Sequence, residues 1–303
     1  MSTWLEYATM QNLFSDLDGH EKQTLFVVGN GFDLYHGLPT SYSHFYHWLK
    51  GRGDDEFVNA LERLYPSKFG DKNLLWHDFE KALGEFDIDS MFDQNFKGDS
   101  LDWYPQIKNV ITNQISQYVD RIKDEVKEWT KSIDVSKAKK MLPLPVESKY
   151  LTFNYTPTLE CIYDIPASQI CHIHGSCLSD KDVIVGHDTS VDTDKIEDTE
   201  CDFWIGEAKK AIADTFCSLY KKSGDMIYKE HSAFFVSLKG IDRIVVLGHS
   251  LSKIDIPYFG QIKCFVDKEA HWHLSKFSIK DEENIDKFVN NMELKKYRWI
   301  FNL

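Results

Sequence analysis

The sequence predicts an α/β protein in which helical insertions interrupt a parallel sheet. Short runs of β-type apolar residues recur along the chain, several of them end at glycine or asparagine, and long helical patterns separate them. Runs that are apolar at nearly every position indicate strands buried on both faces, as in a parallel sheet covered by helices.

The expected strands share a short apolar run followed by a glycine or polar residue. In chain order they span residues 24–28, 150–153, 169–173, 182–185 and 243–247, with weaker candidates at 271–274 and 299–301. About 120 residues separate the first strand from the second, which is far more than one crossover connection needs.

Helical periodicity occupies the long intervals between these strands. The expected helices cover residues 1–17, 42–49, 57–64, 75–83, 107–129 and 205–238. The longest pattern starts with Ile107, Ile111 and Ile115, which recur at steps of four and predict one long amphipathic helix.

We therefore expect a single α/β domain that covers residues 1–303. Its sheet core would comprise about 21–50 and 146–303, with a helical insertion at about 51–145 and a second helical segment at about 204–239. Residues 188–202 carry seven carboxylates against one lysine, which predicts a solvated connector.

Composition and charge exclude several classes of protein. Apolar residues make up 42% of the chain and charged residues 27%, so a packed core is expected. With 35 Lys and Arg against 48 Asp and Glu, the net charge of −13 disfavours broad nucleic-acid binding and anionic membranes. The chain has no signal-peptide pattern and no apolar run of about 18 residues, which predicts a cytoplasmic protein with no membrane partner. None of the six cysteines forms a C-x-x-C pair, so reduced thiols are expected and a zinc ribbon is not.

A glycine-rich turn follows the first strand and precedes a helix. Such a turn lets backbone N–H groups approach a phosphate without obstruction by a Cβ atom. The nucleotide-contact candidates in this turn are Gly29, Asn30, Gly31, Phe32, Asp33, Gly37 and Pro39.

Four elements resemble, in order, the motifs of the sirtuin-like NAD-binding fold. They are the glycine turn, Thr152-Phe153-Asn154-Tyr155, His172-Ile173-His174-Gly175-Ser176, and Leu247-Gly248-His249-Ser250-Leu251 with Asp255 downstream. The resemblance implies a Rossmann-like sheet with NAD as its ligand. It also implies further nucleotide contacts at Gly248, His249, Ser250 and Asp255.

The amino-acid sequences of these motifs more closely resemble those of the AbiH family of bacterial abortive-infection proteins. The similar segments are 29–42, which begins Gly-Asn-Gly-Phe-Asp-Leu, 76–80, 153–156 and 172–175. The resemblance extends over most of the chain and is least distinctive in the helical insertions. The resemblance implies defence against bacteriophage by shutting down the infected cell, with a phage trigger or a partner defence protein.

In the sirtuin-like fold the catalytic pair is an asparagine and a histidine, which match Asn154 and His174. A carboxamide can bind ribose hydroxyls or a water, and an imidazole can act as general base near neutral pH. The implied reaction is hydrolysis of NAD, as substrate, at the nicotinamide–ribose bond, and no metal is expected.

The sequence also predicts the roles of two further residues in these motifs, His172 and Asp33. His172 precedes His174 by two residues, so on a strand both side chains would face the same way, with His172 as a core histidine. Asp33 stands where the sirtuin-like fold has serine. Because its carboxylate would repel a diphosphate, we expect Asp33 to bind a ribose hydroxyl or to cap the following helix.

Two other functions remain open at this point. One is a metal-dependent nuclease or phosphoesterase that would use the side chains of His172, His174, His187, Asp188 and His249. The other is a non-catalytic module that binds a nucleotide signal and acts by forming a homo-oligomer.

Overall fold

The computed structural model describes residues 10–64, 76, 79–84, 104–187, 203–216, 219, 223–276 and 280–301. The chain forms two compact units. The first comprises Met1–Thr40, Thr130–Lys181 and Lys222–Leu303, and the second comprises Ser41–Trp129 and Asp182–Lys221. All the described strands belong to the first unit.

The first unit contains a six-stranded, all-parallel sheet, which confirms the predicted α/β class. Its strands are β1 (Thr24–Val28), β2 (Lys149–Thr152), β3 (Ile170–His172), β4 (Arg243–Leu247), β5 (His271–Lys276) and β6 (Tyr297–Phe301). Their spatial order is β3-β2-β1-β4-β5-β6, and every neighbouring pair is parallel. This is the strand order of a Rossmann-like doubly wound sheet.

One expected strand is wrong. Residues 182–185 form no strand, although Val183 and Val185 are buried as their apolar character suggests. This segment belongs to the second unit, where His187 N donates to Leu219 O at 3.0 Å. A short apolar run can be buried against helices without pairing in a sheet, and periodicity does not separate the two cases.

One face of the sheet is covered by helices that come from three parts of the first unit. They are α1 (Met10–Leu17), α2 (Asn30–Tyr35) and α9 (Thr158–Tyr163). Phe26 on β1 and Tyr150 on β2 stack at 5.1 Å between ring centroids, and they share one buried cluster with Phe32 of α2 and Tyr163 of α9. Alternate residues of the strands supply this face, as the period of two requires.

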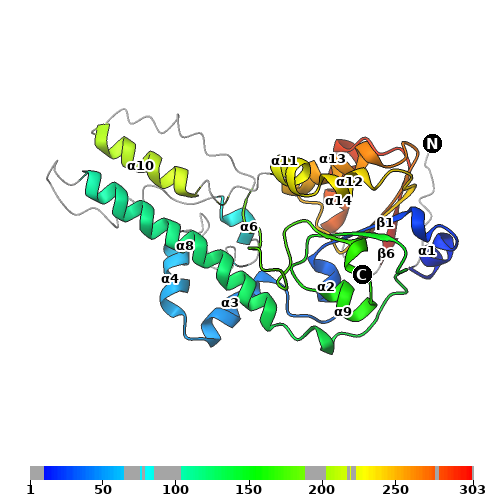
Figure 1. Cartoon of the computed structure of the whole chain (residues 1–303), viewed down its shortest axis with the longest axis horizontal. Helices are drawn as coiled ribbons and strands as arrows, with labels where there is room; N and C mark the ends of the chain where they lie inside the picture. The colour runs from blue at the N-terminus through cyan, green and yellow to red at the C-terminus, as the bar shows by residue number, and fades with distance from the viewer. Residues whose placement is uncertain are drawn as a thin grey trace. The chain divides into compact units, whose positions relative to one another are not determined.

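The opposite face is covered by α11 (Ser223–Asp225), the π-helical turn η7 (Met226–Glu230), α12 (Ser232–Val236), α13 (Ile256–Phe265) and α14 (Lys280–Asn291). Figure 1 shows α11 to α14 together on the side of the strands away from α2 and α9. Phe259 of α13 packs on Phe288 of α14 at 4.9 Å, and both rings lie within 6.5 Å of Trp272 on β5. The apolar strands are therefore buried on both faces, as predicted.

Short 3₁₀ turns connect these elements of the first unit. They are η1 (Glu21–Gln23), η3 (Val135–Lys137), η4 (Ala167–Gln169) and η8 (Lys253–Asp255).

The second unit is helical in its described residues. Its helices are α3 (Tyr42–Gly51), α4 (Asp55–Leu64), α6 (Phe79–Ala82), most of α8 (Tyr104–Ser132) and α10 (Phe203–Phe216). Phe45 of α3 contacts the rings of Trp76, Phe79 and Trp129 at 5.2 to 6.1 Å. These rings form the aromatic centre of the unit, and the long helix predicted over 107–129 is confirmed as α8.

The remaining expected helices fall mainly on described segments. The helices predicted at 42–49 and 57–64 are α3 and α4, and the predicted pair at 205–238 contains α10 and α12. Residues 1–9, most of 65–78 and the acidic segment 188–202 lie outside the described residues. Within the described part of the chain, no helix has both the length and the apolar composition that a membrane crossing needs.

We expect Phe288→Ala to lower the free energy of unfolding by about 3–5 kcal/mol, because it empties the contact between α13, α14 and β5. Urea denaturation would measure the loss. Val236→Ala is the control: its side chain is 58% exposed, so its effect should stay within about 0.5 kcal/mol. Equal effects of the two substitutions would contradict the packing described for this face.

Candidate functional site

The carboxyl ends of β1 and β4 meet where the strand order reverses. In open α/β sheets, ligands bind in the crevice outside the carboxyl ends of the strands at such a reversal. The segments that follow these two strands are 29–33 and 248–255, and both carry the motifs singled out in the sequence. This edge of the sheet is therefore the candidate site.

Three glycines let the two segments touch through their backbones. A Cβ atom on Gly29 would lie 2.7 Å from the Cα atom of His249, and one on Gly31 would lie 2.8 Å from the carbonyl oxygen of Gly248. Gly248 has a φ of +62°, and a Cβ atom there would collide with the backbone of Phe32. Side chains are excluded from this contact by backbone atoms, which cannot move aside.

The same contact occupies two of the backbone N–H groups that the sequence assigns to a phosphate. Gly29 N donates to Leu247 O at 3.0 Å, and Gly31 N donates to Gly248 O at 2.7 Å. Gly248 N in turn donates to Ser275 Oγ at 2.9 Å, which ties the end of β4 to β5. These hydrogen bonds hold three strand ends together.

The other residues of the glycine turn lie in different surroundings. Asn30 and Pro39 are exposed, and Gly37 has a φ of +77° in the turn that ends α2. Phe32 is fully buried under the sheet, where its ring contacts His36 at 4.3 Å and Tyr163 at 5.8 Å. Phe32 thus packs in the core beneath the turn.

Asp33 is the most deeply buried carboxylate described near this edge, with 1% of its surface exposed. Thr156 Oγ1 donates to Asp33 Oδ2, and Thr158 Oγ1 donates to Thr156 Oγ1 at 3.1 Å. Burial raises the pKa of Asp33 to about 6, and hydrogen bonds from Thr156, Thr158 and Asn154 oppose that rise. The carboxylate therefore links α2 to the segment after β2.

Asp33 does not cap a helix. It lies in the first turn of α2, whose N-cap is Gly29. The helix that follows, α3, is capped by Ser41, whose side chain accepts from His44 N. The capping alternative was wrong because a buried threonine pair offers Asp33 a donor from the neighbouring strand end.

Asn154 connects the ends of β1, β2 and β3. Its Nδ2 donates to Gly29 O at 3.1 Å, and its backbone carbonyl accepts from His172 Nδ1 at 3.0 Å. His172 Nε2 lies 2.8 Å from Glu160 Oε1 on α9, so both of its nitrogens face oxygen atoms. His172 is therefore a half-buried, hydrogen-bonded histidine, and its ring holds the backbone carbonyl of Asn154 in place.

His174 does not share the surroundings of His172. The strand β3 ends at His172, and Gly175 N donates back to His172 O in a turn, so the alternation of side chains stops there. His174 is 3% exposed, and its ring contacts Phe153 at 5.2 Å and Tyr258 of α13 at 5.7 Å. The expectation that both histidines face the same way was wrong.

His249 and Asp255 form a second polar pair at this edge. Leu251 N donates to His249 Nδ1 at 2.9 Å, so the hydrogen of the neutral ring lies on Nε2. That Nε2 lies 3.4 Å from Asp255 Oδ2, and both side chains are nearly buried. Both nitrogens of His249 are therefore occupied within the protein. Ser250, between them in sequence, is exposed.

Phe153 brings the two histidines together. Its half-buried ring contacts His249 at 4.4 Å and His174 at 5.2 Å, edge-on in both cases. The sequence motifs include Phe153 and Thr156 without a role of their own, and Thr158 lies outside every motif. A signal was present, since all three lie within six residues of the end of β2, a strand whose neighbours carry the glycine and histidine motifs.

The metal-site alternative gains no support from the described residues. No cluster of three or more His, Cys, Asp or Glu side chains that could hold a metal occurs among them. His187 belongs to the second unit, and Asp188 lies outside the described residues. His172 is already bonded to Asn154 O and Glu160.

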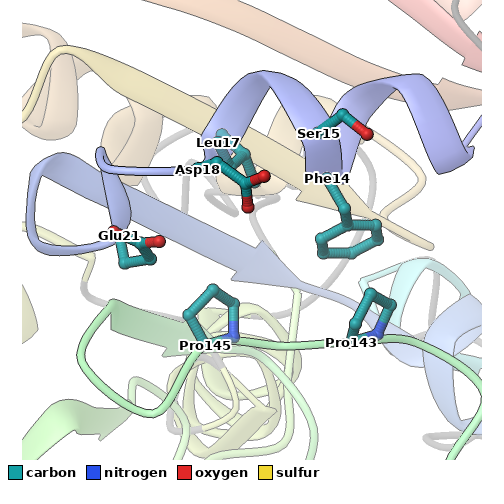
Figure 2. A pocket seen from close by; sticks show the side chains of 7 residues that line it. All are labelled: Phe14, Ser15, Leu17, Asp18, Glu21, Pro143 and Pro145. Carbon is teal, nitrogen blue, oxygen red and sulfur yellow. The ribbon is translucent and has the colours of Figure 1, made fainter.

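A small cavity of about 230 Å³ lies elsewhere in the first unit. Figure 2 shows its side chains, which come from α1, from Asp18 and Glu21 between α1 and β1, and from Pro143 and Pro145 before β2. It therefore adjoins the amino ends of β1 and β2, whereas the candidate site is at the carboxyl ends.

A family model described as bacteriophage abortive infection AbiH matches residues 25–276, which is more than half of the chain. The matched range runs from β1 to the end of β5 and includes every residue of the candidate site. No curated protein and no solved structure shows a significant match to the chain.

Two helical glycines offer a matched test of the backbone contact. We expect Gly31→Ala to destabilise the protein by about 1–3 kcal/mol, because the new methyl group meets Gly248 O. Gly260→Ala in α13 adds the same methyl group where nothing lies within 4 Å, so it should be neutral or stabilising by up to about 1 kcal/mol. Thermal unfolding of both variants would show the difference, and an unchanged Gly31→Ala protein would refute the contact.

The buried carboxylate predicts a pH dependence. The pKa of Asp33 is about 6 in the folded protein and ordinarily 3.8, so the folded state binds its proton more tightly. Its contribution to stability is therefore greatest below pH 4 and falls as the pH rises through 6. At about 1.4 kcal/mol per pKa unit, the full fall is about 3 kcal/mol.

Asp33→Asn lacks this titration. The unfolding free energy of Asp33→Asn relative to wild type should thus rise between pH 4 and pH 7, as measured by urea denaturation at each pH. Asp164→Asn, at an exposed left-handed position that asparagine tolerates, should give a flat difference. A flat difference for Asp33→Asn as well would show that Asp33 titrates normally.

Proposed function

The chain belongs to the AbiH family of bacteriophage abortive-infection proteins, and we propose that it acts in this defence by hydrolysing NAD at the nicotinamide–ribose bond. The observation that supports this proposal is the convergence of Asn154, His174 and the His249–Asp255 pair around Phe153. They meet at the carboxyl edge of a sheet whose strand order is the one that binds dinucleotides.

His174 is the group we assign as general base. It matches the histidine of the sirtuin-like catalytic pair, and its ring lies at the carboxyl edge of the sheet, 5.2 Å from the ring of Phe153 and 5.7 Å from that of Tyr258. In the proposed step, the bond between nicotinamide nitrogen and ribose C1′ breaks and a bond from water oxygen to C1′ forms. The proton lost by that water passes to His174, and nicotinamide leaves as a neutral molecule.

Asn154 and Phe153 orient the ligand in this proposal. The Nδ2 group of Asn154 is committed to Gly29 O, so its carboxamide oxygen is the atom assigned to a ribose hydroxyl. The half-buried ring of Phe153 offers an aromatic surface for a planar heterocycle. The internal hydrogen bonds of Gly29 and Gly31 leave the diphosphate to other groups.

A second candidate is a non-catalytic module that binds a nucleotide signal. The observation that favours it is the extent to which the proposed machinery is used internally, since Asn154 Nδ2 and two glycine N–H groups are bonded within the protein. His174 is also 3% exposed, which a sensor tolerates better than a hydrolase does. In this case NAD or a related nucleotide would bind without turnover.

The experiment that tests the proposal is release of nicotinamide from NAD by the purified protein, with and without an extract of phage-infected cells. We expect hydrolysis in at least one condition, with a loss of about 100-fold or more in His174→Gln. The control His20→Gln changes a histidine 44% exposed before β1 and should retain activity. Circular dichroism would confirm that both variants fold.

The outcomes separate the candidates. Intact NAD in both conditions would overturn hydrolysis, and saturable NAD binding measured by calorimetry would then favour the sensor. Hydrolysis that persists in folded His174→Gln would retain the reaction but reject the assigned base. Protection of cells against phage by His174→Gln at the wild-type level would separate the defence from any chemistry at His174.

A further inference from the structure

The cavity at the amino ends of β1 and β2 is a separate candidate for recognition. Its apolar wall consists of Phe14 and Leu17 of α1 on one side and Pro143 and Pro145 on the other. Figure 2 shows the ring of Phe14 facing the two prolines across the cavity. The inner side of Phe14 lies parallel to Phe26 of β1 at 6.4 Å, so the ring is backed by the core.

Among the described residues that line the cavity, two are charged, and both are carboxylates. Asp18 follows α1, and Glu21 opens the 3₁₀ turn before β1. Glu21 Oε1 accepts from Gly19 N at 3.0 Å, which fixes the carboxylate in place. Backbone N–H groups of Glu21 and Gly19 lower the pKa of Glu21, so it stays ionised well below neutral pH.

Two independent features of this cavity select the same chemistry. Ionised carboxylates attract a cation and accept hydrogen bonds from it. The face of an aromatic ring also attracts a cation, by about 0.5–1 kcal/mol at exposed sites. The apolar wall between them suits the methylene stem of a lysine or arginine side chain, which packs along apolar surface while its charge faces polar groups.

The size of the cavity selects among cationic ligands. At about 230 Å³ it is smaller than the roughly 300–1,000 Å³ of sites that enclose a drug-sized molecule. A single side chain fits this volume, and a dinucleotide does not. The flanking residues Met141 and Val146 are 47% and 41% exposed, so apolar surface continues on either side of the prolines.

We propose that this cavity is a docking site for a partner protein that inserts an arginine or lysine side chain from an extended segment with apolar neighbours. The cation lies between the carboxylates of Asp18 and Glu21 and the ring of Phe14. The neighbouring apolar residues of the partner cover Pro143, Met141 and Val146. This inference goes beyond the proposed function and does not depend on NAD chemistry.

A pair of short peptides tests the inference directly. The probes are fluorescein-labelled Ala-Leu-Arg-Leu-Ala and the same peptide with citrulline, which has the shape of arginine without its charge. We expect saturable binding of the arginine peptide to the full chain by fluorescence anisotropy, weaker by tenfold or more for the citrulline peptide. Binding should also weaken as salt is added, because the contact is ionic and exposed.

Variants locate the binding. Asp18→Asn combined with Glu21→Gln should weaken the arginine peptide tenfold or more. Glu147→Gln removes an exposed carboxylate from the same segment as the prolines but outside the cavity, and it should leave binding unchanged. Urea denaturation of each variant would confirm that the fold is retained.

Each outcome decides the proposal. The proposal is supported if the double variant loses binding and Glu147→Gln retains it. Equal binding of both peptides, equal effects of the two sets of variants, or no saturable binding of the arginine peptide to wild type would overturn it. None of these measurements includes NAD, so failure here is distinguishable from failure of the proposed hydrolysis.

Discussion

The close backbone contact between the segments after β1 and β4 is the constraint on which the rest of the site depends. Gly31 N donates to Gly248 O at 2.7 Å, and no Cβ atom fits at either residue. Because the two segments touch, α2 begins directly at the strand ends instead of after a longer loop. As a result, the side chains of Phe32 and Asp33, in the first turn of α2, are buried beneath the carboxyl edge of the sheet. The ring of His249 lies beside that of Phe153.

Burial of Asp33 is the main consequence of this constraint. A buried carboxylate is costly unless it is hydrogen-bonded, and the donors come from Thr156 and Thr158 after β2. The same strand end supplies Asn154, whose amide holds Gly29 O. Two hydrogen bonds thus run from donors after β2 to acceptors after β1, and they fix the positions of the candidate ligand groups at this edge.

The two ends of the sheet differ in chemistry. The carboxyl edge presents histidines, a carboxamide and an aromatic ring, which suit a nucleotide. The amino edge presents a small apolar cavity with two carboxylates, which suits a cationic side chain. Because the two proposed sites lie at opposite ends of one sheet, the proposed partner could bind without covering the proposed nucleotide site. The overall charge of −13 accords with a cationic partner.

The sequence by itself determined the α/β class, the parallel sheet and six of its strands, because apolar runs buried on both faces have a local signature. It also identified the segments that meet at the carboxyl edge. It could not assign residues 182–185, since burial outside a sheet and pairing within one give the same apolar run. It also could not separate His172 from His174, because the end of β3 is set by a turn at Gly175. Only the tertiary structure decided that the glycines serve a contact between two loops and that Asp33 bonds to threonine. Both depend on atoms more than a hundred residues away in sequence, and no local pattern records such a distance.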